Sequence, residues 1–127
     1  MLTDFNVESI LQFQESLKRL QATLESPDIT EVVLPSQLQE IQQIFEHQIM
    51  TLNLEVFNPT ILPIWQSYLT ETHKQIRLLT IDLRFLKASR QTQTAQTRRT
   101  QTGERIATLI GYCDAILAHS FLTSKIE

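Results

Sequence analysis

The segment from Trp65 to Arg90 constrains the fold of this chain most. Along it a set of mostly apolar residues, called the stripe below, recurs in alternating steps of four and three residues. Such spacing keeps one side of a long helix facing a partner helix. A helix of about 26 residues is about 39 Å long and does not fold alone in water. It therefore has to pack against other helices. The stripe comprises Trp65, Leu69, Thr72, Ile76, Leu79, Leu83, Leu86 and Arg90.

Two segments before it carry the same periodicity. The first predicts a helix over 6–25, with Asn6 as its N-cap and Pro27 as its stop. The second predicts a helix over 36–52 that opens after Pro35. Their predicted core sides are Ile10, Phe13, Leu17, Leu20 and Leu24 in the first helix, and Leu38, Ile41, Phe45, Ile49 and Leu52 in the second.

The helix that holds the long stripe is predicted over 61–90. A cap at Thr60 places Pro63 in the first turn, where its missing backbone donor costs nothing.

A polar segment, 91–102, follows this helix and contains five threonines and no large apolar residue. It is either a loop or the exposed first turns of the last helix. Counting back from Cys113 in alternating steps of four and three residues continues a stripe of helical spacing into this polar segment, which favours a helix there. The last helix is predicted over 95–120, with Gly103 as the alternative start. Its predicted buried residues are Ile106, Leu109, Ile110, Cys113, Ile116 and Leu117.

Four amphipathic helices with short connections predict an all-α fold, an antiparallel four-helix bundle with two shorter and two longer helices in one domain over 1–127. The single cysteine cannot form an internal disulfide, and we expect it in the core of a protein from a reducing compartment. The chain shows neither a signal-peptide pattern nor an apolar stretch of about 18 residues. We expect a soluble, cytoplasmic protein without membrane contact.

Charge is unevenly distributed along the chain. Residues 1–60 carry two basic and nine acidic side chains, a net charge of −7, whereas residues 61–127 carry nine basic and five acidic ones, a net charge of +4. Either the two halves attract each other within one fold, or the basic half presents a partner-binding face.

The second half of the long helix is apolar on two sides. At 100° per residue, Leu78, Ile81 and Phe85 lie nearly opposite the stripe. Basic residues lie between the two sides. Either this helix is flanked on both sides within its own bundle, or the second apolar side is a homodimer or partner interface.

No residue pattern indicates catalysis. Gly103 and Gly111 are too isolated for a phosphate-binding loop, and the three histidines lack the Glu-x-x-His pairing of a di-iron bundle. Glu71 and His73 point about 200° apart on a helix and do not share a metal. We therefore expect no enzyme activity, no cofactor, no metal and no small-molecule substrate.

A nucleic-acid interface is less favoured. The span 74–105 holds eight basic and two acidic residues, which suits phosphate binding. However, the chain is acidic overall, and it has neither a recognition-helix motif nor an aromatic stacking platform.

Several motifs together resemble the heterocyst frequency control protein PatD family of cyanobacteria. The resemblance covers about two thirds of the chain. The motifs are Gln43-Ile44-Phe45 with Ile49, Trp65-Gln66-Ser67-Tyr68, Thr70-Glu71-x-x-Lys74-x-x-Arg77-Leu78-Leu79-x-x-Asp82-x-x-Phe85-Leu86, and Leu109-Ile110-Gly111-Tyr112-Cys113.

The resemblance implies a non-enzymatic regulator that limits how often vegetative cells of filamentous cyanobacteria become heterocysts. It also implies a protein partner, the tubulin-like division protein FtsZ, whose assembly such regulators modulate. Our hypothesis is that a basic set of side chains meets an acidic surface or tail of the partner. A structural, homodimeric helical adaptor is the alternative. The basic set is Arg77, Arg84 and Lys87, with Arg98 and Arg99 nearby.

Overall fold

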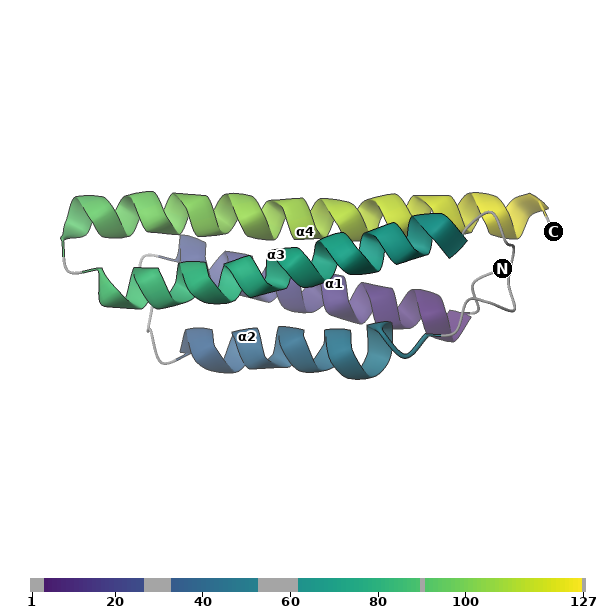
Figure 1. Cartoon of the computed structure of the whole chain (residues 1–127), viewed down its shortest axis with the longest axis horizontal. Coiled ribbons are helices and arrows are strands. Elements are labelled where there is room, and N and C mark those ends of the chain that lie inside the picture. Colours follow the sequence, from purple (N-terminus) through teal and green to yellow (C-terminus); the bar gives the residue numbers. More distant parts are fainter. Residues whose placement is uncertain (1–3, 27–32, 53–61, 90, 127) are drawn as a thin grey trace.

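The computed structural model describes residues 4–26, 33–52, 62–89 and 91–126 and contains four packed helices. Consecutive helices run antiparallel, so that α1 begins and α4 ends at the same end of the bundle (Figure 1). The predicted all-α bundle of two shorter and two longer helices is confirmed. The helices are α1 (Asp4–Glu25), α2 (Val33–Ile44), which continues as the π-helix η1 (Phe45–Ile49), α3 (Leu62–Ala88) and α4 (Thr92–Ile126).

The core consists of the predicted stripes. All five positions of the α1 stripe are buried, and so are the α3 stripe positions from Trp65 to Leu86 except Leu69, which is half-buried. Leu38 and Leu52 at the ends of the second stripe are also half-buried. The stripes meet in one cluster, to which α4 contributes Ile106, Leu109, Cys113 and Ile116.

The predicted start of α2 was three residues too late. Leu34 is only 6% exposed and packs on the core, which favours a helix that begins at Val33. Pro35 is tolerated because the first-turn backbone N–H groups of a helix have no partner within it. Past Ile44 the helix widens into η1, where Met50 donates its backbone N–H to the carbonyl of Phe45 at 2.8 Å, a π-type bond across five residues.

The polar segment after α3 is helical from Thr92, so α4 starts before both predicted starts and also runs past the predicted end, to Ile126. Its threonines are compatible with a helix because their hydroxyls donate to carbonyls one turn back. Thr97 does so to Gln93 at 3.1 Å, and the buried Thr102 to Arg98 at 2.7 Å.

The other two helices differ from prediction at their ends. Asn6 lies inside α1, which starts two residues earlier at Asp4, so the predicted N-cap position is wrong. α3 ends at Ala88, and Ser89 donates its backbone N–H to the carbonyl of Leu86. Pro63 is in the first turn of α3, whereas the predicted Thr60 cap and the stripe position Arg90 lie outside the described residues.

The four helices form a ring in which each packs on its sequence neighbours and α4 closes against α1. The contact between α2 and α3 is the sparsest of these. A hydrogen bond from Gln42 Nε2 to Thr80 Oγ1, 3.1 Å long, joins this pair. The ring therefore leaves the outer side of α3, and its boundary with α2, open to other contacts.

Candidate functional site

The basic residues predicted as a contact set lie on two helices. Arg77, Arg84 and Lys87 are exposed on α3, and within the described part of the chain none of them forms an ion pair. Arg98 and Arg99 of α4 are half-buried. Of this predicted set, the three cations on α3 are therefore the ones available to an acidic partner.

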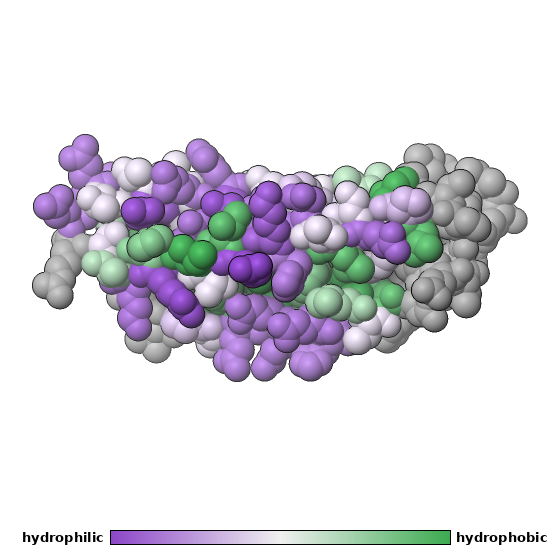
Figure 2. Space-filling view, in the orientation of Figure 1, coloured by the Kyte–Doolittle hydropathy of each residue, from purple (hydrophilic) through white to green (hydrophobic). Residues whose placement is uncertain are grey.

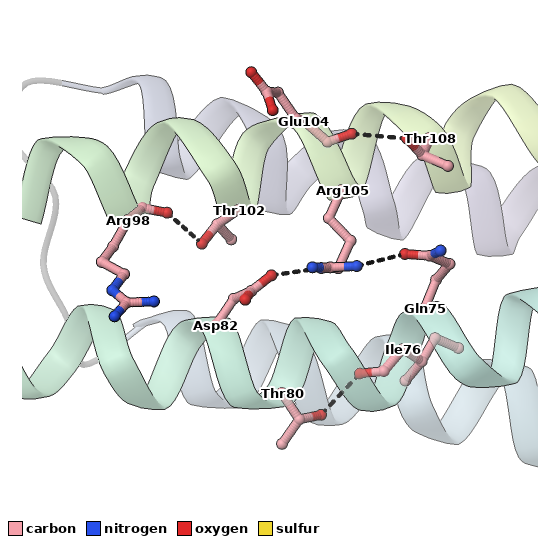
Figure 3. A network of polar contacts seen from close by, with 9 residues as sticks. All are labelled: Gln75, Ile76, Thr80, Asp82, Arg98, Thr102, Glu104, Arg105 and Thr108. Atoms are coloured by element: carbon pink, nitrogen blue, oxygen red, sulfur yellow. Dashed lines mark hydrogen bonds and ion pairs between the residues drawn. The ribbon is translucent and has the colours of Figure 1, made fainter.

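The two α4 arginines face different neighbours. The guanidinium of Arg98 lies 4.7 Å from the centroid of the Phe85 ring, and Figure 3 shows this side chain pointing from α4 toward α3. Arg99 instead lines a groove at the C-terminal end of α1, next to Leu24 and Glu25. The structure thus brings Arg98, but not Arg99, to the outer side of α3.

The second apolar side of α3 faces away from the core. Leu78 is half-buried, while Ile81 and Phe85 are 43% and 49% exposed. Figure 2 shows hydrophobic side chains gathered along the C-terminal half of α3 among hydrophilic ones. One interpretation of this apolar side is that a second helix of the same bundle covers it. That interpretation does not hold for Ile81 and Phe85, because both remain exposed. An exposed apolar side next to cations has the composition of a contact surface.

A groove of about 360 Å³ lies between α2 and α3. Its floor is aliphatic, and Arg84 and Lys87 form part of its α3 rim. The predicted α2 stripe begins at Leu38 and omits Leu34, although Leu34 lies one step of four residues before it. The described lining residues are Leu34, Pro35, Leu38, Gln42, Thr80, Leu83, Arg84, Leu86 and Lys87.

An ion pair fixes the rotation of α3 against α4. Arg105 Nε donates to Asp82 Oδ2 at 2.5 Å and its Nη1 donates to Gln75 Oε1 at 2.7 Å. In Figure 3 the Arg105 side chain reaches across to α3, whereas Glu104 points away. This clamp holds the α4-facing side of α3, so that Arg77 and Ile81 are turned toward solvent. Arg105 itself is occupied and does not add to a basic surface.

The buried thiol and phenol have raised pKa values. Tyr68 Oη and Cys113 Sγ lie 3.7 Å apart, and the Tyr68 ring stacks on Trp65 with centroids 5.1 Å apart. Burial raises the pKa of the Cys113 thiol to about 11, with a further contribution from the Asp114 carboxylate. Burial, with Cys113 adding to it, also raises the pKa of the Tyr68 phenol above its usual range. Both groups are neutral at pH 7, which makes Cys113 a poor nucleophile.

Among the described residues, no three His, Cys, Asp or Glu side chains are grouped so that they could hold a metal ion. None of the helices in these parts of the chain is long and apolar enough to cross a membrane.

Comparisons of the chain with protein-family models, with curated proteins and with solved structures gave no match.

Proposed function

We propose that this chain is a non-enzymatic regulatory protein that binds a protein partner through the outer surface of α3. The single observation that carries the proposal is the adjacency of Arg77, Arg84 and Lys87, which are exposed, to Ile81 and Phe85, which are among the most exposed large apolar residues of the described chain. Apolar contact area supplies affinity in such a surface, and unpaired cations steer an acidic partner and fix its orientation.

The partner we propose is FtsZ, and the setting is that of the PatD-like regulators of heterocyst frequency, in the cytoplasm. The motif residues that resemble this family support the proposal, because the longest of them runs along α3 from Thr70 to Leu86. This motif includes Arg77, Leu78 and Phe85 of the outer surface as well as Asp82 of the clamp. A role in modulating assembly needs binding and no catalytic group.

The proposal is tested with purified FtsZ of a filamentous cyanobacterium. Binding is measured by surface plasmon resonance, and assembly by light scattering after GTP is added. We expect wild-type protein to bind and to change the assembly curve, and the triple variant R77E/R84E/K87E to do neither while keeping its helical circular dichroism.

A matched pair of single variants tests whether a loss of binding comes from the contact site or from the change in the net charge of the chain. Arg84→Glu and Lys18→Glu each change the charge by −2, and both residues are exposed, but Lys18 lies on α1. We expect only Arg84→Glu to weaken binding. Equal binding by the wild type and the triple variant would contradict the proposal.

A homodimeric adaptor built on Leu78, Ile81 and Phe85 is the second candidate, favoured by the exposure of Ile81 and Phe85. Nucleic-acid binding is a weaker third candidate, because Arg105 is paired with Asp82 and Arg98 covers Phe85, which reduces the number of free cations in the span 74–105. Binding to a DNA or RNA duplex that falls steeply with salt would favour it.

A further inference from the structure

The groove between α2 and α3 has a floor that can bury apolar side chains. Leu34, Leu83 and Leu86 belong to the core but remain 6%, 8% and 7% exposed, and they line this groove. The half-buried Leu38 and the ring of Pro35 complete its α2 wall. A volume of about 360 Å³ is within the range of ligand pockets, about 300–1,000 Å³. The groove is therefore large enough for a few aliphatic or aromatic side chains.

The charge on this groove is of one sign. Arg84 and Lys87 are three residues apart, so they lie side by side along the α3 rim. None of the described residues that line the groove carries a carboxylate. Glu40 of α2 forms an ion pair with Arg19 of α1, so it does not neutralise the α3 cations. The described charged side chains that line the groove are therefore the cations Arg84 and Lys87 alone.

A second apolar groove offers an internal comparison. It lies between the first half of α3 and α4, measures about 480 Å³, and is lined by Ile64, Tyr68 and Tyr112. Its described charged lining residue is Glu71, and no cation lines it. The same bundle therefore has two grooves of opposite charge, and only the one between α2 and α3 suits an anionic segment.

We infer that the groove between α2 and α3 is the docking site for a short segment of the partner protein, in which large aliphatic or aromatic side chains are flanked by aspartate or glutamate. The apolar side chains enter between Leu38 and Leu83, and the carboxylates meet Arg84 and Lys87. Bidentate pairing is available to Arg84, which adds directional specificity. This inference rests on the proposed function and deepens it, because it adds to the outer surface of α3 a groove on its α2 side that receives apolar side chains of the partner.

The test uses the full chain and a phage-displayed library of random 12-residue peptides. We expect enriched peptides to combine large apolar residues with aspartate or glutamate, and the affinity of a synthetic copy to fall as salt is raised. A library that yields no binder, or binders without acidic residues, would overturn the inference.

Variants then locate the bound peptide. We expect R84E/K87E to weaken binding at least about tenfold, since two attractive pairs become repulsive, and Leu38→Glu to weaken it similarly by placing a carboxylate in the groove. R84E/K87E changes only exposed side chains, so it keeps the test valid if Leu38→Glu does not fold. Leu11→Asp, at an exposed apolar residue on α1, is the control and should bind as the wild type does. Retention of binding in R84E/K87E, or loss of binding in Leu11→Asp, would overturn the inference.

Measuring the binding of FtsZ to the same variants of this chain distinguishes the two proposals. If FtsZ binding falls in R84E/K87E but the library yields no acidic peptide that binds, the groove inference is wrong while the proposed function stands. If FtsZ does not bind but acidic peptides bind with the expected variant pattern, the groove stands and the proposed partner is wrong.

Discussion

The guanidinium of Arg98 lies over the Phe85 ring, 4.7 Å from its centroid, and so connects α4 to the outer side of α3. Both residues belong to sets that the sequence predicts as contact surfaces, one basic and one apolar. Their pairing means that Arg98 is already engaged within the chain and that one face of the Phe85 ring is covered. Arg98 and the covered face of the Phe85 ring are therefore less available to a partner than the exposed cations of α3.

The Arg98–Phe85 pair is expected to contribute modestly to stability. A cation over an exposed aromatic ring is worth about 0.5–1 kcal/mol, and Phe85 is 49% exposed. We predict that Arg98→Ala and Phe85→Leu each lower the free energy of unfolding by about this amount in urea titrations. The double variant should lose less than the sum of the two, because either change alone removes the interaction. Strict additivity would contradict the pairing.

The clamp formed by Arg105 is expected to contribute more to the free energy of unfolding than the Arg98–Phe85 pair does. Its guanidinium makes two hydrogen bonds across the α3–α4 contact, and the side chains of Arg105 and Asp82 are only 26% and 14% exposed. We predict that Arg105→Ala costs about 1.5–3 kcal/mol, because it leaves the Asp82 carboxylate partly buried without its partner. Arg84→Ala is the matched control, and removing that exposed arginine should change stability by less than about 0.5 kcal/mol. Equal effects of the two changes in urea unfolding would refute the clamp.

We predict that the isolated chain is a monomer. Stable homodimers bury on the order of 1,000 Å² or more, whereas the outer side of α3 offers two half-exposed residues, Ile81 and Phe85, next to like charges that would repel a second copy. Light scattering on a dilution series should give the mass of one chain, 14.7 kDa. A mass near twice this value that Ile81→Asp reduces to one chain would instead favour the homodimeric adaptor.

The core residues of this fold could be predicted from the sequence. The same repeat determines which side of each helix is buried and how the helix is rotated toward its neighbours. The stripe from Trp65 to Leu86 is buried almost throughout, as its spacing requires. Periodicity does not identify the polar residues that the bundle buries. Gln14 lies on the buried side of α1 at 4% exposure, and its Nε2 donates to the Ile110 carbonyl at 3.1 Å and to Asp114 at 2.6 Å. Such a position depends on which helix is the neighbour, and that is a tertiary property.

The candidate site was predictable only in part for the same reason. The exposure of Arg84 and Lys87, and of Ile81 and Phe85, follows from their angular positions on one helix. The groove depends on the distance between two helices, which a one-dimensional pattern does not contain. The separation of Arg98 from Arg99 depends on the rotation of α4, since adjacent residues point about 100° apart and reach α3 and α1 respectively.

The buried thiol predicts how stability depends on pH. The pKa of Cys113 is about 11 in the folded chain, against 9.0 as its ordinary value. Between these values the unfolded chain loses the thiol proton while the folded chain keeps it. The free energy of unfolding should therefore be almost unaffected by this group below about pH 8 and should fall as pH rises from there toward 11, by up to about 1.4 kcal/mol per pH unit.

Urea titrations from pH 8 to pH 11 measure this slope, with Cys113→Ala and Tyr68→Phe as the informative variants. Cys113→Ala is less stable at every pH because it leaves a cavity, but it should lose the decline between pH 9 and pH 10. Tyr68→Phe should keep that decline and become flatter above pH 10, where an ordinary tyrosine ionises, because the raised pKa of the Tyr68 phenol steepens the wild-type curve there. A Cys113→Ala curve parallel to the wild type from pH 9 to pH 10 would show that the thiol is not held neutral by burial.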